Sequence, residues 1–262
     1  MVPVYAPSGA ATSTLAPATT QAYHAKLNAS EREPSLLIDR GSIIKWLLAA
    51  TLFLVLLHVI VVISYLVGID FPQKMTFYFD REGNVPTYFS CLLLLLASGV
   101  LGVIAALKHK QRNTMALHWI GLALLFLGLS LDEAVSFHEL LIEPLRNAYQ
   151  LSGVLRFPWV LAGGLFVAGF GIAYLKFFLA LPRQMKGLFL ASAITYITGA
   201  VGMEMVGGYL FVGYNDFSLQ SLPYMVAVTI EESLEMLGIV LFIYTLLRYL
   251  KAYTPRLTLR FK

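Results

Sequence analysis

The chain has 262 residues, of which 58% are hydrophobic and 13% charged, and its mean hydropathy is +0.73. This composition excludes an ordinary soluble globular domain, in which polar surface makes up a much larger share. The single cysteine, Cys91, excludes an intrachain disulfide, a zinc site built on a cysteine pair and a CxxCH haem site. The net charge of +4 comes from basic residues whose positions indicate membrane topology, so we expect no nucleic-acid partner.

Residues 1–38 are rich in Ala, Thr, Ser and Pro, a composition typical of disorder. We predict a disordered cytoplasmic tail here. The segment lacks a basic stretch followed by a short apolar one, so we expect no cleavable signal peptide, and the first span would act as an uncleaved anchor.

Six apolar runs follow, and each is long enough to cross a hydrocarbon core about 30 Å thick, which takes roughly 20 helical residues. The sequence therefore predicts an all-α fold, a polytopic membrane bundle of six transmembrane helices that occupies residues 39–252. A basic cytoplasmic tail, 253–262, would follow it. No internal repeat supports an inverted-repeat transporter. The predicted spans are 43–67, 87–107, 114–135, 158–179, 187–211 and 224–247.

The basic residues predict the orientation of these spans. They cluster before the first span, in the second and fourth connections and after the last span, and cytoplasmic loops carry such an excess. Both termini are therefore expected in the cytoplasm, and we expect a plasma membrane or bacterial inner membrane location. The residues concerned are Lys26, Arg32, Arg40, Lys45, Lys108, Lys110, Arg112, Lys176, Arg183, Lys186, Arg248, Lys251, Arg256, Arg260 and Lys262.

The outer loop 69–88 is rich in aromatic residues, which favour the membrane–water boundary. One interpretation is an interfacial belt that anchors a short loop. The other is a lid over an acidic site, with Asp80 and Glu82 as outer ligands.

The third span carries Asp132 and Glu133, and His138 and Glu139 follow it. If one helix runs over 114–143, it is about 45 Å long and protrudes past the bilayer. Asp132 and Glu139 then share a face, whereas Glu133 lies about 100° from Asp132 and His138 roughly 120° the other way. On this helix His138 and Glu139 need not serve one centre, and Glu139 could belong to a solvated helix end.

The last two spans carry acids of their own. Glu204 lies in the fifth span among small residues, where a protonated glutamate could make one interhelical hydrogen bond. Glu231 and Glu235 are one helical turn apart in the sixth span, and Glu232 lies between them. Two carboxylates at this spacing can hold one hard cation or bridge two.

Lipid does not tolerate these charges singly. A charged residue at a helix centre costs roughly 2.5 to 3.5 kcal/mol, and each apolar residue returns only about 0.3 to 0.6 kcal/mol. Three ionised glutamates in span 224–247 would cost about 8 to 10 kcal/mol. The acids must therefore be protonated, paired with a cation such as Arg146 or Arg156, or bound to a metal ion.

We expect the third of these, an outward-facing carboxylate and histidine cluster that binds a divalent cation, as in a membrane-embedded metalloenzyme. Carboxylates with one imidazole suit Fe, Mn, Zn, Mg or Ca. The alternatives are a proton-coupled transporter of small solutes and a structural partner in a membrane complex. The expected ligands are Asp132, Glu133, His138, Glu139, Glu204, Glu231 and Glu235.

The expected partners are the lipid bilayer, a small-molecule or lipid substrate, and another membrane protein. The sequence contains no nucleophile elbow, phosphate loop, HExxH motif or nucleotide fingerprint. It therefore leaves open whether the protein is an enzyme.

Overall fold

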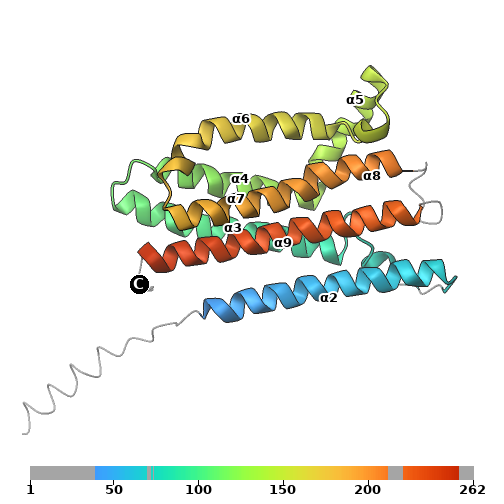
Figure 1. Cartoon of the computed structure of the whole chain (residues 1–262), viewed down its shortest axis with the longest axis horizontal. Coiled ribbons are helices and arrows are strands. Elements are labelled where there is room, and N and C mark those ends of the chain that lie inside the picture. The colour runs from blue at the N-terminus through green and yellow to red at the C-terminus, as the bar shows by residue number, and fades with distance from the viewer. Residues whose placement is uncertain (1–38, 70–71, 73, 212–220, 254–262) are drawn as a thin grey trace, which may run out of the picture. The chain divides into compact units, whose positions relative to one another are not determined.

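A computed structural model describes residues 39–69, 72, 74–211 and 221–253 (Figure 1). Within these ranges the chain forms helices and turns and contains no strand, which confirms the all-α class. The two predicted tails, 1–38 and 253–262, lie outside the described residues, except that Tyr253 ends the last helix.

The described helices follow one another through short connections. The longer ones are α2 (Arg40–Leu66), α3 (Val85–Lys110), α4 (Ala116–Val135), α6 (Trp159–Ala180), α7 (Arg183–Ile197) and α9 (Leu222–Tyr253). The shorter ones are η1 (Lys74–Thr76), η2 (Phe137–Leu141), α5 (Ile142–Tyr149), η3 (Gly153–Leu155), η4 (Thr198–Met203) and α8 (Glu204–Leu210).

Five of these helices are long and apolar enough to cross a membrane: α2, α3, α4, α6 and the continuous Arg183–Leu210 that joins α7, η4 and α8. The predicted fifth span thus begins four residues earlier than expected. α9 is longer still, with 32 residues, but it carries Glu231, Glu232 and Glu235.

α9 lies at the centre of the fold and contacts α2, α3, α7, η4 and α8. Its apolar side is fully buried: Met236, Ile243 and Leu246 each have 0% of their surface exposed. α3 and α4 form a second close pair. Other apolar residues of α9, such as Val226 and Leu237, are exposed, whereas its three glutamates line an internal cavity.

The third predicted span, 114–135, corresponds to α4, and the chain does not continue from it as one helix to residue 143. α4 ends at Val135, and Ser136 adopts a left-handed conformation with φ of 53°. A left-handed residue ends an α-helix because it turns the chain away from the helix axis. The chain then continues as η2 and α5.

The fifth helix contains a π-helical turn, Thr198–Met203, directly before Glu204. Such turns shift the register of a helix and are frequent at functional sites. Glycines let this helix approach α9 closely. A Cβ on Gly199 would lie 2.8 Å from the Glu231 carbonyl oxygen, and one on Gly238 would lie 2.7 Å from the Tyr196 backbone nitrogen.

This contact gives a stability prediction. Gly238→Ala should force α7 and α9 apart, because the atoms that its Cβ meets are backbone atoms that cannot rotate away. We expect a loss of about 1 to 3 kcal/mol, the usual cost of overpacking. Thermal unfolding of the purified protein in detergent would measure it.

Gly99→Ala is the matched control, since its Cβ would meet nothing within 4 Å. An alanine there should be neutral or slightly stabilising, because it favours the helix by roughly 0.5 to 1 kcal/mol. Equal melting temperatures for the two variants would contradict the close packing of α7 on α9.

Candidate functional site

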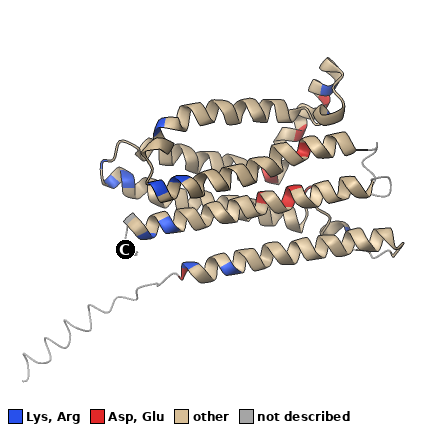
Figure 2. Ribbon diagram, in the orientation of Figure 1, with Lys and Arg blue, Asp and Glu red and all other residues tan. Residues whose placement is uncertain are grey.

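A cavity of about 1690 Å³ lies between α4, α6, α7 and α9, and the loop before α3 and the segment from η2 to Arg156 contribute to its outer end. Apart from Asp39 at the start of α2, the acidic residues of the described chain gather away from the end that carries most lysines and arginines (Figure 2). Ten of the chain's 15 acidic residues line the cavity: Asp80, Glu82, Asp132, Glu133, Glu139, Glu143, Glu204, Glu231, Glu232 and Glu235.

The outermost group consists of Glu82, His138 and Glu139. Each offers one ligand atom, and these atoms all lie within 4.8 Å of one another. Glu82 comes from the loop before α3, whereas His138 and Glu139 are neighbours in η2. Carboxylate oxygens and an imidazole nitrogen at this separation can bind one divalent cation.

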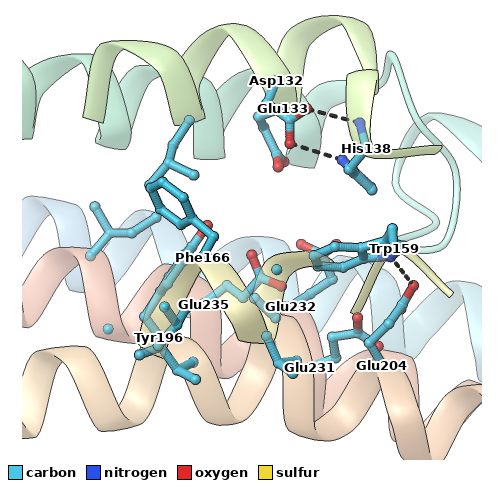
Figure 3. Close-up of a pocket in the computed structure, with 18 of the residues that line it drawn as sticks. Asp132, Glu133, His138, Trp159, Phe166, Tyr196, Glu204, Glu231, Glu232 and Glu235 are labelled. Atoms are coloured by element: carbon cyan, nitrogen blue, oxygen red, sulfur yellow. Dashed lines mark hydrogen bonds and ion pairs between the residues drawn. The ribbon is translucent and has the colours of Figure 1, made fainter. Parts of the chain in front are cut away.

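Asp132 holds His138 in place (Figure 3). The backbone N–H of His138 donates to Oδ1 of Asp132 at 2.9 Å, and Nδ1 of the ring donates to Oδ2, also at 2.9 Å. The break at Ser136 makes this possible, because it turns His138 back over the end of α4. With Nδ1 engaged, Nε2 is the nitrogen left for a ligand. A carboxylate behind the histidine is the usual arrangement in metal sites.

The electrostatics of His138 follow from the same pair. Burial alone would lower the pKa of His138, but the hydrogen bond to Asp132 and the charge of Asp132 outweigh it and raise that pKa above its ordinary value. The ring therefore binds a proton, or another cation, more readily than a histidine in water.

The loop before α3 is fixed by His58 of α2. The backbone N–H of Phe79 donates to Nδ1 of His58 at 3.1 Å, so Nε2 carries the proton and donates to Thr229 of α9 at 3.0 Å. The Phe79 ring also stacks on His58, with 4.2 Å between the ring centroids. These contacts hold the following residues, Asp80 and Glu82, at the mouth of the cavity.

The side chains of Asp80 and Glu82 are exposed to the cavity, where other acidic side chains lie close to them. Burial, followed by the charges of Glu204 and Glu139, raises the pKa of Asp80 to about 7, although Tyr224 donates a 2.7 Å hydrogen bond to it. Burial and the charge of Glu139 also raise the pKa of Glu82, which is hydrogen-bonded to Ser136. Additional positive charge would relieve this mutual repulsion.

A second group connects three helices. The indole N–H of Trp159, the first residue of α6, donates to Oε1 of Glu204 at 2.8 Å. Glu204 in turn interacts with Glu231 of α9. Trp159 also packs against the ring of His138, with 4.9 Å between the centroids, and so links this group to the outermost one.

The deepest group consists of Glu133, Glu232 and Glu235, with Tyr196 of α7 beside them (Figure 3). Glu235 interacts electrostatically with Glu133, and both interact with Glu232. These acids come from α4 and α9, so the space between the two helices concentrates negative charge.

The seven residues that the sequence singled out as ligands thus divide into separate groups. His138 and Glu139 lie together with Glu82, so they can bind the same cation, which the helical spacing alone did not require. Asp132 lies behind His138, Glu204 contacts Glu231, and Glu133 and Glu235 lie deeper. For these five residues metal binding stays a prediction from the sequence.

Sequence reasoning missed three residues that shape the site: His58, Trp159 and Tyr224. A histidine within an apolar span was a signal that pointed to His58, because a buried imidazole needs hydrogen-bond partners. Trp159 and Tyr224 stand at the starts of predicted spans, where aromatic residues are ordinary interface anchors, and nothing in the sequence marked them.

No curated protein and no solved structure matches the chain. One family matches residues 46–250, a region that contains His58 and all ten acidic residues of the cavity. The chain therefore belongs to the family described as a domain of unknown function (DUF8692).

Proposed function

We propose that this multi-pass membrane protein binds a divalent cation at the outer end of its cavity, through Glu82, His138 and Glu139, and uses it as a membrane-embedded metalloenzyme. The observation that carries the proposal is the Asp132–His138 pair, which engages Nδ1 and leaves Nε2 for a ligand in a histidine grouped with two carboxylates, the ligand atoms all lying within 4.8 Å of one another. A solvated acidic helix end would not need a histidine oriented in this way.

Three protein ligands leave coordination positions open for water or substrate, as catalytic sites require. A mixture of imidazole and carboxylate suits zinc, manganese or iron better than calcium or magnesium, which prefer oxygen alone. The cation would also lower the repulsion between Glu82, Glu139 and Asp80.

Proton-coupled transport is the weaker alternative. A proton pathway needs ionisable groups along most of the membrane. Beyond Glu235, the described lining of the cavity turns apolar, with Phe126, Phe189 and Phe242. The acids are thus confined to one part of the cavity, which favours a binding site over a pathway.

For the membrane arrangement, we propose six spans with α9 as the last, in a plasma membrane, with both chain ends in the cytoplasm. Basic residues lie at the start of α2, the end of α3, the junction of α6 and α7 and the end of α9 (Figure 2). The cytoplasmic side carries such an excess, so the acidic mouth would open outward.

Cysteine labelling tests this topology. In a Cys91→Ser background, Val154→Cys should react with a membrane-impermeant maleimide on intact cells, because Val154 is exposed at the acidic end. Arg112→Cys should react only after the membrane is permeabilised. The reverse pattern would refute the orientation.

Metal analysis tests the proposed site. Protein purified without chelators should hold about one zinc, manganese or iron ion per chain. His138→Ala should remove this ion. Loss of a residue that only hydrogen-bonds to a ligand weakens metal binding roughly 10- to 100-fold, and loss of the ligand itself should weaken it more. Titration with Zn²⁺ after chelator treatment would give the affinities.

Glu143→Gln is the matched control. Glu143 also lines the cavity but forms an ion pair with Arg146, so its loss should leave Zn²⁺ affinity nearly unchanged. Absence of metal from the wild-type protein, together with equal Zn²⁺ affinities for the wild type and His138→Ala, would reject the proposal.

The affinity should also depend on pH in a particular direction. His138 must lose its proton to bind a cation, and its pKa is raised, so Zn²⁺ affinity should increase as pH rises through the range above the ordinary histidine value. Asp132→Asn removes the charge that raises this pKa. The pH profile should therefore shift to lower pH, while the maximal affinity falls by about 10- to 100-fold.

Calorimetric titration with Zn²⁺ at several pH values would measure both changes. A profile that keeps its midpoint in Asp132→Asn would show that Asp132 does not control His138.

A further inference from the structure

We propose that the apolar part of the cavity holds one hydrocarbon chain of a membrane phospholipid, whose polar head lies at the acidic end. A phospholipid would be the substrate class of the proposed metal site, and only the role of its head group rests on that proposed function. Binding of the hydrocarbon chain does not depend on the metal.

The cavity has two chemically different parts. Its acidic part ends near Glu235, and beyond it the described lining consists mainly of aromatic and aliphatic side chains. Phe166, Phe170 and Tyr174 follow one another at four-residue steps along α6, and the rings of Phe170 and Tyr174 stack with centroids 4.0 Å apart. Phe126 of α4 and Phe242 of α9 stack with centroids 4.7 Å apart. A ligand that fills both parts must be an amphiphile.

We place the entrance for the chain beside the middle of α6, because the hydrogen bonds and ring contacts that join α6 to the other helices lie near its two ends. At the outer end Trp159 contacts Glu204 and His138. At the inner end the Tyr174 hydroxyl donates to the His118 carbonyl at 3.3 Å, and Phe177 contacts Trp119. Between these anchors Phe166 lines the cavity yet has 53% of its surface exposed.

A side entrance along a membrane-spanning helix opens to lipid chains, not to water. The volume of about 1690 Å³ exceeds the roughly 300 to 1,000 Å³ of ordinary small-molecule sites. Filling its apolar part with water would leave many waters without polar partners. A lipid chain that enters beside α6 contacts the aromatic lining and leaves no polar group without a partner.

The outer end offers a partner for the head group. Nε of Arg156, a residue that lines the cavity, is buried and has no hydrogen-bond partner among the described residues. Its guanidinium lies 4.2 Å from the centroid of the Phe211 ring, which fixes its position. A phosphodiester oxygen is an acceptor suited to this group, and a divalent cation at His138 would offset the surrounding carboxylates.

Photolabelling tests the inference. The full chain would be reconstituted in vesicles that contain a phosphatidylglycerol with a diazirine near the end of one acyl chain. After illumination, mass spectrometry should find label on cavity residues such as Phe126, Phe170 and Phe242. Label confined to lipid-facing residues of α6, such as Leu165 and Ile172, would mean ordinary annular lipid and would overturn the proposal.

Two glycines of α6 provide matched variants. Gly171 lines the cavity and Gly169 does not, and a Cβ on either meets nothing within 4 Å. Gly171→Trp should abolish labelling of the cavity residues, and Gly169→Trp should leave it unchanged. Retained Zn²⁺ binding by Gly171→Trp would show that the variant is folded; equal labelling of the two variants would overturn the proposal.

The same assay separates this inference from the metal proposal. His138→Ala should lose Zn²⁺ and keep the cavity label, because His138 lies outside the apolar part. Arg156→Gln should lower the label by weakening the hold on the head group. If Zn²⁺ binds to the wild-type protein but the cavity stays unlabelled, the lipid inference fails alone.

Discussion

The structure depends on one constraint: carboxyl groups within apolar helices must face one another or water, because lipid cannot solvate them. Ten acids from four parts of the chain meet this requirement by lining one cavity. The requirement also explains the position of α9. A helix with three glutamates in its first half becomes tolerable in a membrane when those glutamates face a cavity and other helices instead of lipid, as they do here.

Collecting like charges creates a second requirement, since they repel one another and need compensation. The chain supplies little of it: among the described lining residues ten acids face three arginines, Arg81, Arg146 and Arg156, and Arg146 already pairs with Glu143. Glu204 accepts a hydrogen bond from the indole of Trp159. The group at Glu82, His138 and Glu139 instead contains an oriented imidazole, which a proton-sharing network would not require. A metal cation compensates this group most directly.

The sequence predicted the long helices well, because runs of apolar residues determine them almost alone. It also identified most of the acids that line the cavity, since charge in an apolar run is conspicuous. It could not predict the break at Ser136, because a serine in the left-handed conformation has no composition signal comparable to glycine. That break brings His138 onto Asp132 and beside Glu139, so helical-wheel angles from one continuous helix separated residues that lie together. The loop that supplies Glu82 is held by His58, a contact 21 residues away that local patterns do not reveal.

Trp159 connects two of the acidic groups in the cavity. As the first residue of α6, it contacts His138 in the outermost group and donates to Glu204 in the next one. The rest of α6 is attached to the bundle mainly through Tyr174 and Phe177, more than ten residues further along. A rigid helix held at both ends transmits displacement along its axis. A lipid chain bound beside the middle of α6, as proposed, would therefore contact the same helix that positions Trp159 next to His138.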